Sequence, residues 1–194
     1  MRKTANVLTI ILCTSAALAL SSCRERPRPA VTRSIDEPHP LLGKSAPAFV
    51  TVDPDGRAVD LNKHLGKNVI MLDFWATWCG PCILAMPDVA SVAKKFEDRG
   101  VVFYAVNVGE DPDSVKEFLA QLKLDIPVAM DFKGEIEKMY QAYGLPHTIL
   151  VGKDGTVQVA HLGYRDDLGE RLADDIEELL AGKDLASETL ADAP

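Results

Sequence analysis

The sequence contains few cysteines and no second closely spaced cysteine pair. Four cysteines occur among 194 residues, whereas disulfide-dependent scaffolds carry several pairs in a shorter chain. The histidines form no His-x-x-x-His pattern; they are His39, His64, His147 and His161. A structural zinc site usually takes four ligands from two such paired motifs. These absences exclude a cysteine-rich scaffold and a structural zinc site, and we predict no metal centre.

The sequence also lacks an excess of positive charge. Lysine and arginine number 21 against 29 aspartates and glutamates, which gives a formal net charge of −8 at pH 7. A protein that binds nucleic acid needs a basic face to neutralise phosphates. The charge balance therefore predicts no nucleic-acid partner.

No apolar run reaches the roughly 20 residues that a membrane-spanning helix needs. The longest run, Val7–Leu20, follows the positive residues Arg2 and Lys3 and precedes small residues. This order of a short positive segment, an apolar segment and small residues is typical of an export signal. An uncleaved N-terminal anchor is the alternative interpretation of the same segment.

The stretch from Leu20 to Cys23 reads Leu-Ser-Ser-Cys and resembles the bacterial lipobox, whose cysteine is lipidated after cleavage. We therefore predict a lipoprotein signal peptide over residues 1–22 and lipidation of Cys23. One acyl chain holds a protein to a bilayer marginally, but two or more hold it stably. The protein is then expected in the bacterial cell envelope, facing the periplasm and anchored to a membrane. The alternative is an ordinary cleaved signal followed by a free thiol.

The rest of the chain divides into three segments. Residues 23–41 are rich in arginine and proline and contain too few apolar residues to bury a core, so they predict an extended tether. Residues 42–182 have the length and composition of one globular domain. Residues 183–194 lack periodic apolar residues and predict a flexible tail.

The middle segment alternates strand and helix patterns. Val69–Trp75 and Val101–Val108 are nearly continuous apolar runs, which is typical of buried parallel strands. Pro81–Arg99, between them, has helical apolar spacing. Further elements are predicted as a hairpin at Val50–Asp60, a helix at Pro112–Leu122, a strand at Pro127–Met130, a helix at Ile136–Tyr143, a hairpin at Thr148–Leu162 and a helix at Asp167–Ala181. The expected fold class is α/β, with a mixed sheet flanked by helices on both faces.

Cys79 and Cys82 are separated only by Gly80 and Pro81, and three interpretations compete. As a staple, a loop this short would contribute only about 2 kcal/mol. As half of a metal site, the pair lacks a partner motif, although it could hold copper with His147 as a third ligand. As a redox reagent, the pair would itself carry the chemistry.

The predicted secondary structure favours the reagent. Cys79 falls where a strand ends and a helix begins, so helix N-terminal amides face its sulfur. Such an environment lowers the pKa of a thiol and makes it a nucleophile near neutral pH. Cys82, one helical turn further, lies on the same side and is expected to be more buried. It can then attack the mixed disulfide that Cys79 forms with a substrate. Pro81 suits the first helical turn, where an N–H has no intrahelical partner.

At this point the chain resembles the thioredoxin superfamily, and within it the exported TlpA/ResA-like thiol-disulfide oxidoreductases. The resemblance covers roughly Leu42 to Leu180. It is carried by Asp73–Cys82 (DFWATWCGPC), Pro87, Val106–Glu110 (VNVGE) and Gly144–Thr148 (GLPHT). It implies a thioredoxin fold with an N-terminal hairpin and a central helix–strand insertion between Pro112 and Met130.

The resemblance also implies roles for single residues. Asp73 matches a buried acid that could accept the proton of Cys82, because burial raises the pKa of a carboxyl group. The alternative is a strand-end aspartate bonded to neighbouring amides. Pro146 matches a cis-proline facing the dithiol, and the backbone of Leu145 would pair with a substrate strand. Trp78 is expected to flank the dithiol at the surface, so that Trp78, Leu145 and Pro146 would bind substrate.

Two positions depart from the family pattern. Many members have a glutamate three residues after the second cysteine, where this chain has Ala85. A carboxylate that tunes the dithiol would then have to be Asp73. The family usually has threonine after the cis-proline, where this chain has His147. His147 could respond to pH or stabilise Cys79, or it could be an exposed spectator.

The function that the resemblance implies is reduction of disulfides in oxidised envelope proteins, such as apocytochrome c, by a monomer that needs no cofactor beyond its own cysteines. A membrane thiol-electron donor would resupply the electrons. Two rival functions remain open at this stage. One is a copper-binding metallochaperone module. The other is a thiol peroxidase of the redoxin type, although the usual Pro-x-x-x-Thr-x-x-Cys spacing is broken by Thr77-Trp78-Cys79.

Overall fold

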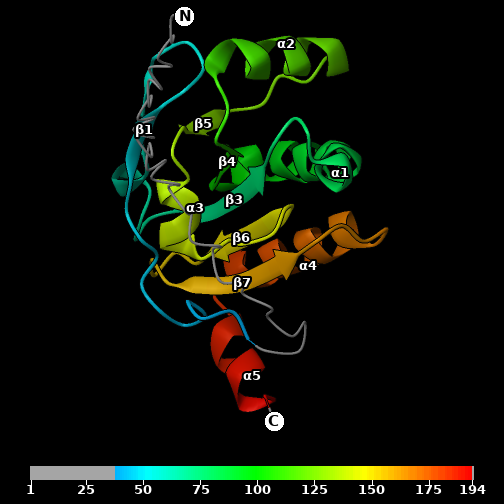
Figure 1. The fold of residues 1–194 in the computed structure, drawn as a ribbon. Coiled ribbons are helices and arrows are strands. Elements are labelled where there is room, and N and C mark those ends of the chain that lie inside the picture. The colour runs from blue at the N-terminus through cyan, green and yellow to red at the C-terminus, as the bar shows by residue number, and fades with distance from the viewer. Residues whose placement is uncertain (1–37, 194) are drawn as a thin grey trace, which may run out of the picture. The chain divides into compact units, whose positions relative to one another are not determined.

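The structure is a computed structural model that describes residues 38–193. The predicted signal peptide and the predicted tether up to residue 37 lie outside the described residues. In chain order the elements are β1 (Val50–Val52), β2 (Ala58–Asp60), η1 (Leu61–Lys63), β3 (Val69–Trp75), α1 (Gly80–Phe96), η2 (Glu97–Arg99), β4 (Val101–Val108), α2 (Pro112–Leu122), β5 (Val128–Asp131), α3 (Glu135–Tyr140), β6 (His147–Val151), β7 (Val157–Leu162), α4 (Leu168–Leu180) and α5 (Leu185–Ala191). Figure 1 shows the sheet between its covering helices.

Strand β3 occupies the middle of a five-stranded sheet with the order β5-β4-β3-β6-β7. Strands β4 and β5 continue parallel to β3, whereas β6 runs antiparallel to β3 and β7 antiparallel to β6. All residues of β3 are buried, as expected for a strand covered on both faces. Strands β1 and β2 form a separate antiparallel hairpin.

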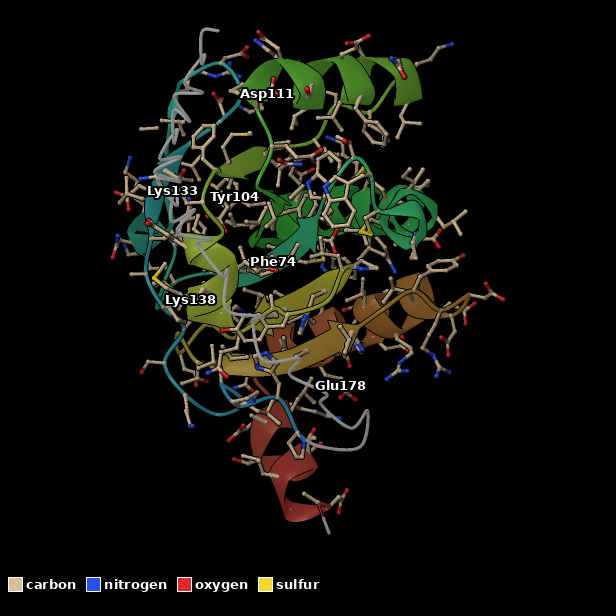
Figure 2. All side chains as sticks on the ribbon, in the orientation of Figure 1. Phe74, Tyr104, Asp111, Lys133, Lys138 and Glu178 are labelled. Atoms are coloured by element: carbon tan, nitrogen blue, oxygen red, sulfur yellow. A yellow bond between two sulfur atoms is a disulfide. The ribbon has the colours of Figure 1, made fainter. Side chains whose placement is uncertain are left out.

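Alternating side chains of β3 enter two different cores. Met71 and Trp75 belong to a core that is shared with α1, α2 and α4, and we refer to this side of the sheet as the α1 face. Leu72 and Phe74 belong to a core that is shared with α3 and the β1–β2 hairpin, on the α3 face. Figure 2 shows Phe74 inside the molecule. By the same alternation Asp73 points to the α1 face.

The thioredoxin fold that the sequence predicts is confirmed. The leading hairpin and the inserted α2 and β5 are present at the expected places. Element ends differ by a few residues: α1 ends at Phe96, and the last predicted turn is the separate 3-10 helix η2. Helix ends commonly tighten into 3-10 geometry.

The prediction of a flexible tail over 183–194 is wrong for residues 185–191, which form α5 and lie against β7. Asp184 caps this helix by accepting a hydrogen bond from the Ser187 amide (3.1 Å). The Ala186 amide donates to Gln158 Oε1 on β7 (3.1 Å). Leu185 is 7% exposed and joins the core of the α1 face. The buried residues of α5 are Leu185 and Ala186, and two neighbouring residues cannot produce a periodic apolar pattern. The helix is therefore stabilised by tertiary contacts that the sequence does not display.

Replacing Leu185 with alanine should therefore destabilise the protein by about 2–3 kcal/mol, the usual loss for a buried leucine. Leu190 lies on the same helix but is 46% exposed, so Leu190→Ala is the matched control and should change stability by less than about 0.5 kcal/mol. Urea unfolding measures both. Equal, small effects of the two substitutions would show that α5 does not belong to the folded domain.

Candidate active site

Cys79 lies at the boundary between β3 and α1. Strand β3 ends at Trp75, and Cys79 is the N-cap residue of α1, with extended backbone angles (φ −86°, ψ 97°). Its Sγ accepts a hydrogen bond from the backbone amide of Cys82 (3.3 Å). Pro81 occupies the first turn of the helix, as predicted. The sulfur of Cys79 is thus placed at the positive end of the helix dipole.

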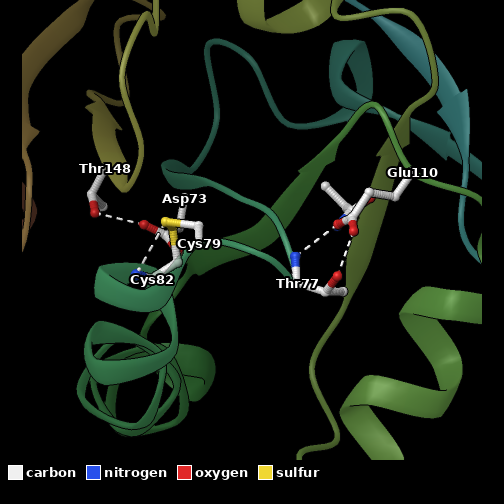
Figure 3. The surroundings of a disulfide bond; sticks show 7 residues. Asp73, Thr77, Cys79, Cys82, Glu110 and Thr148 are labelled. Carbon is white, nitrogen blue, oxygen red and sulfur yellow. Dashed lines mark hydrogen bonds between the residues drawn. A yellow bond between two sulfur atoms is a disulfide. The ribbon is translucent and has the colours of Figure 1, made fainter.

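Cys79 and Cys82 form a disulfide with their Cα atoms 5.2 Å apart (Figure 3). Their exposed fractions are 5% and 1%, so Cys82 is the more deeply buried of the two. Both cysteines belong to the core of the α1 face, together with Ala85. Ala85 is fully buried, so the position where relatives can carry a glutamate adds only apolar surface here.

Asp73 is a buried carboxyl group in the centre of the sheet. It is 2% exposed, and its Oδ1 accepts a hydrogen bond from the hydroxyl of Thr148 on β6 (2.8 Å; Figure 3). Burial raises the pKa of Asp73 to about 7, although the Thr148 hydrogen bond opposes this shift. A carboxyl group with this pKa can exchange a proton near neutral pH. The alternative of an aspartate held by neighbouring amides is not what the contacts show.

The loop before β6 contains the cis peptide bond between Leu145 and Pro146 that the resemblance implied. The Pro146 carbonyl accepts a hydrogen bond from the Gly163 amide (2.8 Å), which ties the loop to the end of β7. Leu145 packs against the core that contains both cysteines. Trp78, just before Cys79, is 72% exposed, as predicted for a residue that flanks the dithiol.

His147 is neither exposed nor directed to the dithiol. It is 2% exposed, so the exposed spectator is wrong. Because its neighbour Thr148 points to Asp73 on the α1 face, strand alternation directs His147 to the α3 face, away from the disulfide. There its ring lies 5.2 Å from the ring of His39, nearly perpendicular to it. A direct contact between His147 and Cys79 is therefore not supported.

The structure adds a contact to which the sequence analysis gave no role. Glu110 follows β4, and its carboxylate accepts hydrogen bonds from the backbone amide of Thr77 (2.8 Å) and from the Thr77 hydroxyl. The side-chain amide of Asn107 donates to the same carboxylate (2.7 Å). Both Asn107 and Glu110 belong to the VNVGE stretch that carried the family resemblance. That stretch could have identified Asn107 and Glu110 as residues of interest, but nothing in it indicated a contact with Thr77.

Two further predictions concern metals and membranes. Within residues 38–193, no three side chains of histidine, cysteine, aspartate or glutamate are grouped so as to hold a metal ion. The copper site built on His147 therefore has no support in this part of the chain. No helix of the described region is both long and apolar enough to cross a membrane. The predicted lipidation site, Cys23, lies outside the described residues.

Comparisons with known proteins place these features in a family. The Redoxin family model matches residues 41–178. A protein named thiol-disulfide oxidoreductase ResA from Bacillus thuringiensis subsp. konkukian is 38% identical over 139 residues, which is 72% of this chain and 76% of that protein. ResA from Bacillus subtilis is 37% identical over 115 residues, or 59% of this chain and 64% of that protein.

A solved structure agrees with this relationship. The crystal structure of a protein described as thiol:disulfide interchange protein DsbE, from Chlorobium tepidum, superposes with a TM-score of 0.65 at 34% sequence identity. The match covers 70% of this chain and 95% of that protein. All three of these proteins are named for disulfide chemistry, not for metal transfer or peroxide reduction. The chain belongs to the Redoxin family and, within the thioredoxin superfamily, to its TlpA/ResA-like thiol-disulfide oxidoreductases.

Proposed function

We propose that this protein is a membrane-tethered reductase of disulfides in envelope proteins, and that Cys79 is its nucleophile. One observation carries the proposal: the Cys79–Cys82 disulfide lies at the start of α1, with the more buried sulfur in the core that Asp73 also faces. Cys79, the less buried of the two at 5% exposed, suits attack on a substrate, and the more deeply buried Cys82, at 1% exposed, suits the second step.

The proposed reaction transfers two electrons from the reduced dithiol to a substrate disulfide. The Cys79 thiolate attacks one substrate sulfur, which forms a mixed disulfide and releases the other substrate sulfur as a thiolate. Cys82 then loses its proton and attacks the sulfur of Cys79. This step forms the Cys79–Cys82 disulfide and releases the second substrate thiolate. The substrate is reduced, and the protein is left oxidised.

Asp73 is the proposed acceptor of the Cys82 proton. Its pKa of about 7 means that a substantial fraction is ionised near neutral pH, so it can take up a proton there and release it later. Trp78, Leu145 and Pro146 are the proposed substrate contacts. The indole of Trp78 is exposed beside Cys79, and the backbone of Leu145 would pair with an extended segment of the substrate.

The direction of electron flow rests on the Gly80-Pro81 pair between the cysteines. This dipeptide resembles the reducing end of the superfamily, near about −270 mV, against about −120 mV for the strong periplasmic oxidant. The difference corresponds to roughly 7 kcal/mol for two electrons. Oxidised envelope proteins such as apocytochrome c would be the substrates, and a membrane thiol-electron donor would reduce the protein again. Lipidated Cys23 would hold the monomer at the periplasmic side of a membrane.

Replacement of Cys82 with serine tests the order of the two sulfurs. The variant should form mixed disulfides through Cys79 and keep them, because the sulfur that resolves them is missing. After expression in a bacterial envelope, non-reducing electrophoresis should show adducts that dithiothreitol removes. Mass spectrometry should place every adduct on Cys79 and identify the substrates.

Two results would contradict the role assignment. Adducts on a residue other than Cys79 would show that another sulfur attacks substrates. A complete absence of adducts, in a variant that is folded and exported, would show that the dithiol does not react with proteins. The Cys79→Ser, Cys82→Ser double variant is the control, because it should form no adduct while keeping the same fold.

A further inference from the structure

The end of β4 places a carboxylate beside the loop that leads to Cys79. Gly109 (φ 75°) turns the chain after Val108, and its amide donates to the Asp131 carbonyl on β5 (2.9 Å). Asp111 is already used as the N-cap of α2, where it accepts hydrogen bonds from the next turn. The side chain of Glu110, between them, is instead hydrogen-bonded to Thr77 and Asn107.

Donors from two strand ends meet at the Glu110 carboxylate. Thr77 provides its backbone amide and its hydroxyl, and Asn107 provides its side-chain amide. Figure 3 shows Glu110 bridging to Thr77 on the loop that also carries Cys79. Hydrogen bonds to an ionised acceptor are roughly twice as strong as those between neutral groups. These contacts therefore bind the loop after β3 to the end of β4 firmly.

The orientation of Asn107 supports a carboxylate-centred arrangement. Asn107 lies opposite Trp75 in the β3–β4 register and is fully buried. Its Nδ2 faces Glu110, whereas its Oδ1 has no hydrogen-bond partner among the described residues. Leaving a buried acceptor unpaired is unfavourable. The amide nitrogen of Asn107 is nevertheless the atom directed to Glu110. This orientation indicates that the Glu110 carboxylate determines how the side chains at the ends of β3 and β4 are arranged.

The loop that Glu110 holds is very short. Ala76 and Thr77 follow β3, Trp78 comes next, and Cys79 caps α1. The Cys79 amide donates to the Ala76 carbonyl (3.1 Å), which closes a tight turn around Thr77. Trp78 is thus the single residue between the anchored Thr77 and the reacting sulfur. A shift of Thr77 would move both the Cys79 sulfur and the exposed indole.

We propose that Glu110 is a positioning residue for the Cys79 dithiol: by holding Thr77, it fixes the Cys79 sulfur at the N-terminus of α1 and presents Trp78 to substrate. This inference rests on the proposed function of Cys79. The β3–β4 ladder itself is complete from Val69 to Trp75 without Glu110. Loss of the carboxylate should therefore loosen the loop beyond the strand while leaving the sheet intact.

The Glu110→Ala variant should lose about tenfold in kcat/KM for disulfide reduction of a protein substrate, because misplacement of a reacting group by a fraction of an ångström is costly. Glu110→Gln should lose less, because its one carbonyl oxygen can still accept hydrogen bonds. Glu117→Gln, at an exposed position of α2, removes the same charge and is the control. It should stay within about twofold of the unaltered protein.

Thr77 provides a second, milder test. Thr77→Val removes the hydroxyl but keeps the shape and the backbone amide, and should lose about threefold in kcat/KM, consistent with one lost hydrogen bond. Thr77→Ser restores the hydroxyl and should recover the rate. The pH dependence of Cys79 alkylation in the reduced protein is the direct readout, since it should move with Glu110→Ala and Thr77→Val and return with Thr77→Ser. A purely structural role would change urea stability but would not shift this profile.

The outcomes separate this inference from the proposed function. If the unaltered protein fails to reduce protein disulfides, the proposed function fails. If it reduces them, and the Glu110 variants keep both kcat/KM and the Cys79 alkylation profile within about twofold, the positioning role is wrong. If the Glu110 variants do not fold, the valine and serine pair at Thr77 decides: equal rates and equal profiles would overturn the proposal.

Discussion

Replacing Cys79 with serine should abolish disulfide reduction, lowering the rate on the order of a thousandfold or more, as happens when the nucleophile of a coupled site is removed. A serine hydroxyl does not ionise near neutral pH and does not form disulfides. Insulin-disulfide reduction with dithiothreitol as electron donor measures the effect. Cys23→Ser in the full chain is the matched control: it should keep the rate, because Cys23 precedes residues 41–178, which match the Redoxin family and contain the dithiol.

The reactivity of Cys79 depends on the position of its sulfur at the start of α1. The helix amides and dipole there favour a thiolate, so the pKa of reduced Cys79 should lie below that of a free cysteine. The rate of iodoacetamide alkylation against pH measures this ionisation. A Cys79 that ionises no more readily than a free cysteine, or a Cys79→Ser variant that still reduces insulin, would contradict the nucleophile assignment.

The dithiol was predictable because the features that define it are local. An apolar run followed by Cys-Gly-Pro-Cys and a helical pattern already places Cys79 at a strand–helix junction, and the structure has it as the N-cap of α1. Burial of Asp73 was predictable for a similar reason, since it is a single charge inside a strand without polar neighbours. Sequence patterns therefore recover a site when its residues lie within one strand and the start of the helix that follows it.

The remaining features depend on contacts between distant residues. Thr77 and Glu110 are separated by 33 positions, and neither has a local pattern that identifies the other. His147 is the first residue of β6, and the face of the sheet to which its side chain points is set by the pairing of β6 with β3. Helix α5 is stabilised by the hydrogen bond between the Ala186 amide and Gln158 and by the packing of Leu185 in the core. Such contacts become visible only when the strands are in register.

Asp73→Asn should separate catalysis from stability, because the two are expected to change in opposite directions. The substitution removes a proton acceptor, and loss of a general base typically costs about a hundredfold or more in rate. Asparagine keeps an oxygen that can accept the Thr148 hydroxyl, which now bonds to Asp73 Oδ1. We therefore expect disulfide turnover to fall about a hundredfold at pH 7 while the fold is retained.

The pH dependence of stability follows from the raised pKa of Asp73. Below the ordinary value of 3.8, the group is protonated in both the folded and the unfolded chain and contributes no pH-dependent term. Between 3.8 and about 7 the unfolded chain ionises while the folded protein holds the proton, so stability is lost as pH rises. Above about 7 the loss is complete, at about 4 kcal/mol for a difference of about 3 pH units.

The side chain introduced by Asp73→Asn cannot ionise, so the variant should escape this loss. At pH 8 it should be more stable than the unaltered protein by up to about 4 kcal/mol, and at pH 4 the difference should be small. Urea unfolding of the oxidised protein at both pH values measures it. Asp131→Asn is the matched control, because buried Asp131 accepts the amides of Glu135 and Glu137 (2.8 Å each). Losing one acceptor there should destabilise by about 1–2 kcal/mol.

A gain in stability at pH 8 that accompanies a loss of turnover would mean that the carboxyl group is retained for its chemistry at a cost to the fold, a relation found at many active sites. The comparison between the two aspartates makes this specific, because both are buried and only Asp73 faces the dithiol. If Asp73→Asn shows the same stability difference from the unaltered protein at pH 4 and pH 8, the raised pKa is wrong. Full turnover by the variant at pH 7 would remove Asp73 from the proton-transfer step.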